Sequence, residues 1–243
     1  MRVRLTLSYD GSAFSGFQVQ KNAESVQGAL CRALLTLCRE EVGVSGCSRT
    51  DAGVHARTFV CHSDLPFDEL PKTFLKSLNA LLPDAVSVFD VTPVADDFHA
   101  RYSAKQKTYR YYVWNHASRA PLFSGRVLHE PRTLDLDAMD RAAKQFLGTH
   151  DFAAFQAAGS KVRDTVRTVS RCRIVRENDS LFYLEISANG FLYRMVRNVM
   201  GTLLDIGRGE PYDVPKLLLE ADRTKAGRCA PPEGLYLWQV DYQ

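Results

Sequence analysis

The first half of the chain begins with a strand pattern and continues with a helix pattern. Apolar residues occupy every second position from Val3 to Tyr9, which predicts a strand over about residues 2–9. Apolar residues then recur at three- and four-residue spacing over about 24–40, as on the buried face of a helix. A second helix should begin after Asp68, a suitable N-cap residue. The remaining strand patterns lie near about 42–47, 57–63 and 85–92. The resulting β-α-β-β-α-β order is that of a ferredoxin-like unit.

The second half repeats these kinds of pattern without repeating the sequence. Its strand patterns cover about 107–115, 165–175, 181–187 and 235–242, and its helix patterns cover about 134–148, 191–207 and 214–221. Gly148 should end the first of these helices. We therefore expect an α/β, more narrowly α+β, fold of two ferredoxin-like β-α-β-β-α-β halves with a central cleft. The boundary should lie in the polar run near 96–107, between an N-terminal domain 1–103 and a C-terminal domain 104–243.

The composition is that of a folded protein from a reducing compartment. With 243 residues, 45% of them hydrophobic, the chain can bury a substantial core. The N-terminal alternation differs from the continuous apolar run of a signal peptide, and no apolar run reaches the roughly 18 residues of a membrane span. The six cysteines form no CxxC pair, and His55 and His62 have no neighbours at metal-ligand spacing. We expect a cytoplasmic protein with no membrane association, buried free thiols and no bound metal.

Positive charge is concentrated in the second half of the chain. The net charge of +3 divides into −2 for residues 1–103 and +5 for residues 104–243. This imbalance favours a polyanionic partner, although an ordinary solvated surface would account for it equally well.

The segment CSRTDAGVHAR, residues 47–57, gathers chemically active side chains between two strand patterns. Ala52 and Gly53 follow Asp51, keep the turn narrow and leave the carboxylate accessible to a bulky substrate. Arg49 would project to the same side in an extended segment and favour the ionised carboxylate. The alternative is an Asx-turn with a surface ion pair, and the spacing alone favours neither.

Two further segments combine positive charge with features of nucleic-acid binding. RYSAKQKTYRYYVWN, residues 101–115, interleaves basic residues with rings such as Tyr109, which suits contacts with unpaired RNA. In SKVRDTVRTVSRCRIVR, residues 160–176, strand alternation would place Arg167, Arg171 and Arg173 on one face. The alternatives are a place in the sheet core for most of the rings and a solvated sheet face for the arginines.

Two arginines interrupt the apolar helix pattern FLYRMVRNVMG. Arg194 and Arg197 are three residues apart, so they lie on adjacent positions of one side of the helix. An arginine in such a stretch usually reaches solvent or a specific carboxylate. Asp51 is a candidate for that carboxylate.

Several motifs together resemble one known family. SRTDAGVHA, around Asp51, closely resembles the catalytic motif of the tRNA pseudouridine synthase A family. The resemblance continues in family order through YDGSAFSGFQ, SVQGAL, FHARYSA, KTYRYYVWN, ANGFLYRMVRNVMG and PPEGLYLWQVDY. It implies the pseudouridine synthase fold, with two α/β halves around the active cleft. It also implies an isomerase that needs neither a metal nor an organic cofactor.

The resemblance implies roles for individual residues. It makes Asp51 the catalytic nucleophile and Arg49 a base-flipping residue that pairs with its carboxylate. Tyr109 would bind the substrate by contacting the target uracil, and Arg197 would lie near the catalytic aspartate, while Arg194 matches less closely. The implied substrate is the tRNA anticodon stem-loop, whose uridines 38, 39 and 40 become pseudouridine. The implied assembly is a homodimer whose two-subunit surface binds tRNA.

Other functions and routes stay open on the residues alone. A pseudouridine synthase of different site specificity, or a non-catalytic tRNA-binding protein, would retain the basic and aromatic segments. A hydrolase acting on small glycosides would need a second carboxylate, and none is evident near Asp51 in the sequence. In an isomerase, Asp51 would attack ribose C1′ or ring C6, or act as a base. RNA binding through phosphates should weaken steeply as the salt concentration rises.

Overall fold

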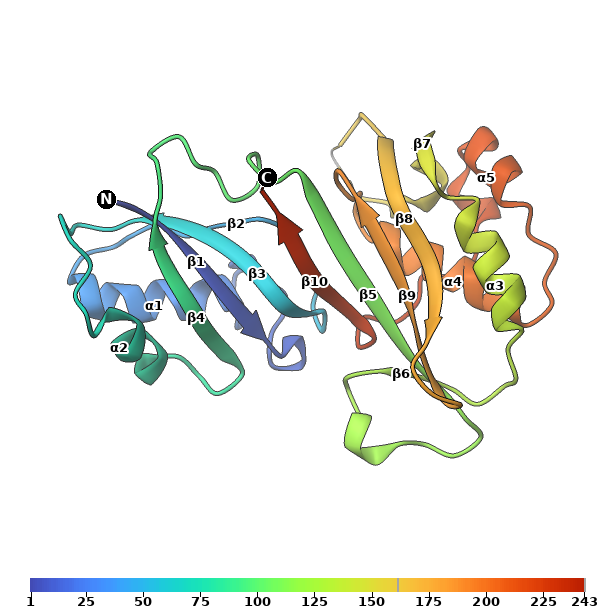
Figure 1. Cartoon of the computed structure of the whole chain (residues 1–243), viewed down its shortest axis with the longest axis horizontal. Helices are drawn as coiled ribbons and strands as arrows, with labels where there is room; N and C mark the ends of the chain where they lie inside the picture. Colours follow the sequence, from blue (N-terminus) through green and yellow to red (C-terminus); the bar gives the residue numbers. More distant parts are fainter. Residues whose placement is uncertain (161, 243) are drawn as a thin grey trace. The chain divides into compact units, whose positions relative to one another are not determined.

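The computed structural model of the chain describes residues 1–160 and 162–242 (Figure 1). Lys161, in the expected basic segment, and Gln243, at the end of the expected second domain, lie outside the described residues. The chain divides into unit 1, which is Met1–Lys105 with the C-terminal strand from Tyr236, and unit 2, which is Gln106–Leu235. The last strand, which the sequence order assigned to the second half, is therefore grouped with the first.

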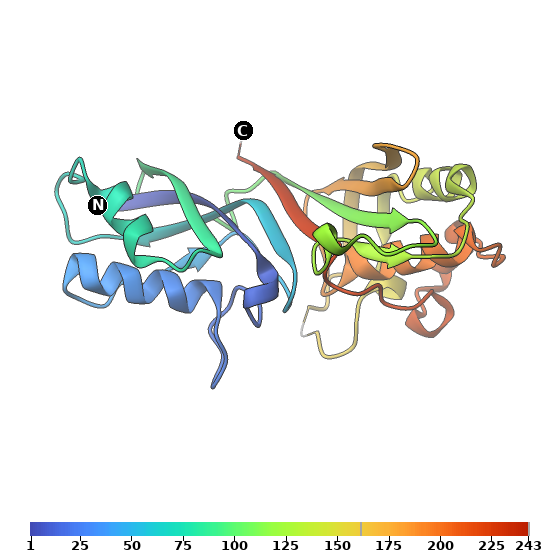
Figure 2. The same ribbon diagram turned by 90° about the horizontal axis from the view of Figure 1, so that it is seen from below.

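Unit 1 is built on a sheet with the strand order β4 (Val86–Pro93), β1 (Arg2–Tyr9), β3 (His55–Asp64) and β10 (Leu235–Asp241). β1 is antiparallel to β3 and β4, β10 pairs in parallel with the start of β3, and β2 (Ser45–Gly46) pairs with β3. α1 (Val26–Cys38) runs along one face of this sheet, as Figures 1 and 2 show, and α2 (Phe74–Leu81) packs on β4. The expected β-α-β-β-α-β order of this half is confirmed.

Local sequence signals explain the first strand and the first helix of unit 1. The alternating residues Val3, Leu5 and Leu7 of β1 are fully buried. Ser25 accepts a hydrogen bond from Gly28 N across 3.1 Å and so caps α1.

The start of the second helix differs from the prediction. α2 begins at Phe74, and Asp68 lies in irregular backbone before it. Pro71 disfavours helical backbone at the residue that precedes it, so the helix begins only beyond the proline.

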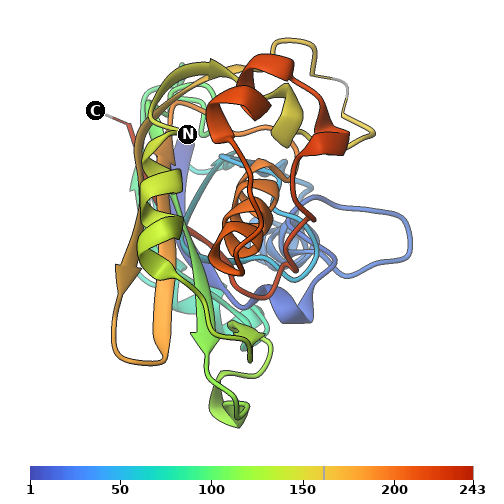
Figure 3. The ribbon, with the colours of Figure 1, turned by 90° about the vertical axis from the view of Figure 1, so that its right-hand side faces the viewer.

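Unit 2 is built on a sheet with the strand order β5 (Gln106–Asn115), β9 (Leu181–Ala188), β8 (Val166–Arg176) and β7 (Gly148–Asp151). β6 (Leu128–Glu130) pairs in parallel with β5. α4 (Met195–Gly207) lies on one side of this sheet with α3 (Leu136–Lys144) beside it (Figure 3), and α5 (Val214–Glu220) follows in the chain. The described residues also include the 3₁₀ turns η1 (Gly11–Ala13), η2 (Pro121–Phe123), η3 (Ala153–Phe155) and η4 (Arg223–Lys225).

The predicted α/β class is confirmed, but some boundaries in unit 2 were wrong. α3 ends at Lys144, and Gly148, expected to end it, instead opens the short strand β7 with a φ of 103°. Glycine adopts such a positive φ without the steric cost that other residues bear. α4 begins at Met195 and not near 191, because Arg194 before it has a left-handed φ of 58°.

Candidate functional site

The loop that carries Asp51 joins β2 to β3 in unit 1. Cys47 N donates to Val60 O across 2.8 Å at the start of the loop, and Val54 N donates to Asp51 O across 3.1 Å near its end. Gly53 supplies the positive φ of 77° that this turn requires. Asp51 is half-buried, so the loop presents its carboxylate from a defined turn.

The segment before α1 fixes the position of this loop. Phe17 N donates to Thr50 O across 3.2 Å, and the hydroxyls of Tyr9 and the buried Thr50 share a hydrogen bond of 2.8 Å. A Cβ atom at Gly16 would come within 2.6 Å of Thr50 O, so the two backbones approach closely. Thr50, which precedes Asp51, is therefore held in place through both its backbone and its side chain.

Arg49 behaves differently from the expectation. Its exposed guanidinium forms no hydrogen bond or ion pair with any residue that the structure describes, so the expected pairing with Asp51 is not present. The reason is local, because the chain turns at Asp51 and the two side chains no longer follow strand alternation. Arg49 instead lines a cavity of about 230 Å³ beside the loop.

That cavity, which we call the loop pocket, lies wholly within unit 1. Its lining includes Gln18, Gln27, Ser48, Arg49, Arg101 and Tyr102. The basic and aromatic segment predicted from sequence contributes the last two. The two glutamines were missed, although both stand in motifs that carry the family resemblance.

The two histidines of β3 each accept a hydrogen bond from a backbone N–H group. His55 is buried and its Nδ1 accepts a hydrogen bond from Gly11 N across 3.0 Å. His62 is also buried, and its Nδ1 accepts from Ala100 N across 3.1 Å. In the described part of the chain, no three His, Cys, Asp or Glu side chains gather as a metal site would require.

The six cysteines are free thiols, but Cys31, Cys38 and Cys229 are only half-buried, where the sequence predicted buried thiols. Cys47, Cys61 and Cys172 are buried, and burial raises the pKa of the Cys61 thiol well above its usual value. A thiol in this state is a poor nucleophile.

Tyr109 lies on β5 in unit 2. It is 6% exposed, and its ring meets the ring of Phe191 edge to face at 4.9 Å. Tyr111, two residues further, is fully buried and donates its hydroxyl to Pro231 O across 2.7 Å. The core alternative is therefore correct for Tyr111, whereas Tyr102 is 77% exposed and belongs to the surface.

Arg197 and Arg194 occupy different environments at the start of α4. Arg197 is 9% exposed, and its Nε donates to Ala230 O across 2.7 Å. Ala230 N returns a hydrogen bond to Arg197 O across 3.0 Å, so the guanidinium is anchored to a neighbouring segment. Arg194 is exposed and its guanidinium lies 4.9 Å from the ring centroid of Tyr193.

Of the expected site residues, unit 1 holds Asp51 and Arg49, and unit 2 holds Tyr109 and Arg197.

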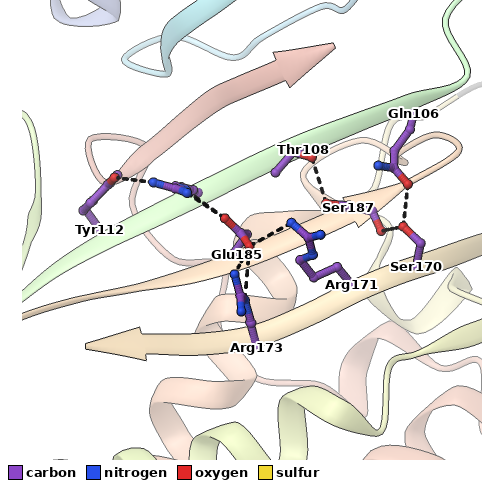
Figure 4. Close-up of polar contacts among 9 residues, drawn as sticks. Gln106, Thr108, Tyr112, Ser170, Arg171, Arg173, Glu185 and Ser187 are labelled. Carbon is purple, nitrogen blue, oxygen red and sulfur yellow. Dashed lines mark hydrogen bonds and ion pairs between the residues drawn. The ribbon is translucent and has the colours of Figure 1, made fainter. Parts of the chain in front are cut away.

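The arginines of β8 surround a buried carboxylate that sequence reasoning missed. Figure 4 shows Arg171 and Arg173 pointing toward Glu185 on β9, which is only 2% exposed. Glu185 accepts hydrogen bonds of 2.8 Å from Arg173 and from Arg110 on β5, and one of 3.3 Å from Arg171. Burial by itself would raise the pKa of Glu185, but the bonds from Arg173 and Arg110 outweigh it and the pKa is lowered.

Arg167 does not share the face of Arg171 and Arg173, so that prediction was wrong. The register of β8 against β9 shifts between Val169 and Arg171, which marks a bulge. Val169 and Cys172 are both buried although they are three positions apart, so the alternation reverses between them. Arg167 therefore belongs to the face of Val169, and its Nη1 donates to Asp164 O across 3.1 Å.

The chain resembles known proteins over nearly its whole length. A family model described as tRNA pseudouridine synthase matches residues 6–103 and 142–243. The chain is 44% identical over 247 residues to tRNA pseudouridine synthase A of Ruminiclostridium cellulolyticum, and 43% identical over 246 residues to that of Acetivibrio thermocellus. Both alignments cover 99% of this chain and 99% of the relative. A chain in the crystal structure of the archaeal box H/ACA sRNP Nop10-Cbf5 complex aligns with 84% of this chain and 44% of its own length, at 11% identity and a TM-score of 0.39.

The fixed aspartate loop and these matches define the class: the chain belongs to the tRNA pseudouridine synthase family. Within that family, the relatives described above carry the name tRNA pseudouridine synthase A. The resemblance drawn from the motifs is confirmed. In the described residues, no helix combines the length and the apolar character needed to cross a membrane.

Proposed function

We propose that this protein isomerises uridine to pseudouridine in tRNA at the Asp51 loop. The family supports the reaction, and the name of its relatives supports tRNA as the substrate. The observation that carries the assignment is the position of Asp51, half-buried in a turn whose backbone is hydrogen-bonded to neighbouring segments. A carboxylate held this way can meet a bulky substrate without first being ordered.

The reaction exchanges the C1′–N1 bond of uridine for a C1′–C5 bond, with no net oxidation or reduction. If Asp51 attacks C1′, N1 leaves with the bonding electrons. C5 of the turned base then displaces the carboxylate, C5 loses its proton to water, and N1 takes up a proton. If Asp51 instead adds to C6 or acts as a base, the same bonds are exchanged. Every route replaces the hydrogen on C5, so release of that hydrogen reports the reaction.

Arg49, Tyr109 and Arg197 would each have a role in the same reaction. A uridine in a stem must leave the helix to react, at a cost of a few kcal/mol. Arg49, exposed and without an intramolecular partner among the described residues, would occupy the vacated space. Tyr109 would contact the uracil and Arg197 would serve as a catalytic residue, and the burial of both side chains supports a fixed position for each.

The first experiment measures tritium release from tRNA labelled at uridine C5. The wild type should release tritium, and Asp51→Asn should release it at least about a thousandfold more slowly, because the amide is neither a nucleophile nor a base. Asp84→Asn, at an exposed turn residue of the same unit, is the matched control and should retain activity. Equal release by wild type and Asp51→Asn would remove the basis of the assignment. Tight tRNA binding without release by any form would favour the non-catalytic RNA-binding alternative.

The finer parts of the proposal have tests of their own. We place the targets at uridines 38, 39 and 40 of the anticodon stem-loop, the protein in the cytoplasm, and the active form in a homodimer. Mapping pseudouridine in tRNA from cells that lack the protein should show loss at those positions, and loss elsewhere would contradict the specificity. Light scattering on the eluted peak of a sizing column should give twice the 27.3 kDa of one chain.

A further inference from the structure

The loop pocket carries features that the catalytic residues do not explain. It holds about 230 Å³, below the roughly 300–1,000 Å³ that encloses a drug-sized ligand, so it suits a group no larger than one nucleotide. Arg49 in its wall is two residues from Asp51, which limits their Cα separation to about 7 Å. A group bound there would therefore lie next to the reacting nucleotide.

Two positive charges at this pocket are available to a ligand. The guanidinium groups of Arg49 and Arg101 form no hydrogen bond or ion pair with the residues that the structure describes. Both residues are exposed, and the Arg101 guanidinium lies 5.7 Å from the ring centroid of Tyr102. Arginines in this state are suited to a phosphate, whose charge they can neutralise.

Tyr102 presents a ring that is exposed and yet held in place. It is 77% exposed, and its ring lies on that of His99 with centroids 4.4 Å apart and planes 38° apart. Tyr102 N also donates to His99 Nδ1 across 3.3 Å, and the His99 ring lies 4.7 Å from that of the buried His62. The ring is thus ordered before any ligand arrives, which lowers the entropy cost of stacking a base on it.

The wall of the pocket offers a hydrogen-bond acceptor of defined orientation. Gln27 accepts from Val19 N across 2.9 Å through Oε1 and donates from Nε2 to Val44 O across 2.7 Å, so backbone groups fix the orientation of its amide. Gln18 must then donate its Nε2 to the same Gln27 Oε1, at 2.6 Å. This arrangement leaves Gln18 Oε1 to accept from an N–H group of a base.

We propose that the loop pocket binds one unpaired nucleotide of the RNA, the chain neighbour of the target uridine. Its base stacks on Tyr102, its phosphate lies beside Arg101, and an N–H group on its edge donates to Gln18. The inference rests on the proposed function, because it takes the target to be a uridine in an RNA strand.

The test uses full-length protein carrying Asp51→Asn, so that bound RNA stays unreacted. Anticodon stem-loops carry the fluorescent base 2-aminopurine either just before or just after the target uridine. Binding should quench the fluorescence at one of these two positions, because stacking on an aromatic ring quenches the probe. Adding Tyr102→Ala should remove the quenching and weaken binding by about tenfold. Tyr102→Phe, which keeps the ring, should retain both.

The other results of this experiment would contradict either the pocket assignment or the proposed function. The pocket assignment would be overturned if quenching survived in the Tyr102→Ala variant. It would also be overturned if neither probe position showed quenching. Both conclusions hold even if the wild-type protein releases tritium from tRNA. Absence of tritium release would instead contradict the proposed function, and the pocket assignment with it. Saturating uridine monophosphate should not displace the stem-loop. Displacement would assign the pocket to a free nucleotide and overturn its assignment to the RNA.

Discussion

Two groups of arginines in this protein look alike in the sequence and differ in the structure. On the unit 2 sheet, Arg171 and Arg173 converge on the buried Glu185 (Figure 4), and Arg110 pairs with the same carboxylate at 2.8 Å. Their charge is partly neutralised within the protein, and their hydrogen bonds hold three neighbouring strands together. The sequence left Arg171 and Arg173 of β8 open between a nucleic-acid-binding strip and a solvated sheet face, and in the structure both guanidinium groups pair with Glu185.

At the loop pocket of unit 1 the opposite arrangement holds. Arg49 and Arg101 lack a carboxylate partner among the described residues, although unit 1 belongs to the half with the less positive balance. Net charge along a sequence therefore does not locate the charge that a ligand can use. What counts is whether each guanidinium already has a partner, and that depends on the fold.

Removing the Glu185 carboxylate, which the three arginines share, should have the largest effect on stability. Glu185→Gln should lower the free energy of unfolding by about 2 kcal/mol, less than the roughly 3–5 kcal/mol of a fully buried pair, because Arg171 and Arg173 are half exposed. Urea denaturation measures the change, and Glu40→Gln, at an exposed residue of unit 1, is the control. A loss as small as that of the control would mean that the network does not stabilise the unit.

Acid should weaken unit 2 through the same kind of buried carboxylate. Burial alone would raise the pKa of Glu130, but hydrogen bonds from Arg132 and Arg208 outweigh it and lower the pKa from 4.5 to about 2. A lowered folded-state pKa gives stability that is present above the unfolded value and lost as the pH falls through the folded one. The full shift corresponds to roughly 3 kcal/mol, but Arg132 is exposed and its contribution is screened. The free energy of unfolding should therefore fall by about 1 to 2 kcal/mol between about pH 4.5 and pH 2.

The control for this pH dependence is Glu130→Gln. The free energy of unfolding of this variant should be lower than that of the wild type at neutral pH. It should also change less as the pH falls through the acid range, because the variant has no proton to gain at this position. A variant that follows the wild-type pH curve would show that other carboxylates, such as Glu185, dominate the acid response.

The sequence predicted what depends on local pattern. Alternation located β1, the order of unit 1 was correct, and the small residues after Asp51 indicated a narrow turn. These features follow from residues within a few positions of one another, where periodicity and turn preferences operate.

Features set by pairing between distant segments could not be predicted in this way. Glu185 was missed because its partners come from two other strands, and their register is fixed only when the sheet forms. The bulge beyond Val169 reverses the face of Arg167, which simple alternation does not detect. Arg49 was expected to pair with Asp51 because two-residue spacing was read as extended chain, whereas the chain turns there.

The most direct test of the comparison, with the smallest expected effect, exchanges one arginine from each group for alanine. Arg101→Ala should weaken tRNA binding by several fold and lower the slope of log affinity against log salt by about 1, because one phosphate contact is lost. Arg171→Ala should leave that slope unchanged, since its guanidinium is already paired with Glu185 at 3.3 Å. Lys76→Ala removes an exposed charge from α2 and controls for net charge. Equal slope changes for Arg101→Ala and Arg171→Ala would show that the network on the unit 2 sheet also contacts phosphates, and the distinction between the two groups would fail.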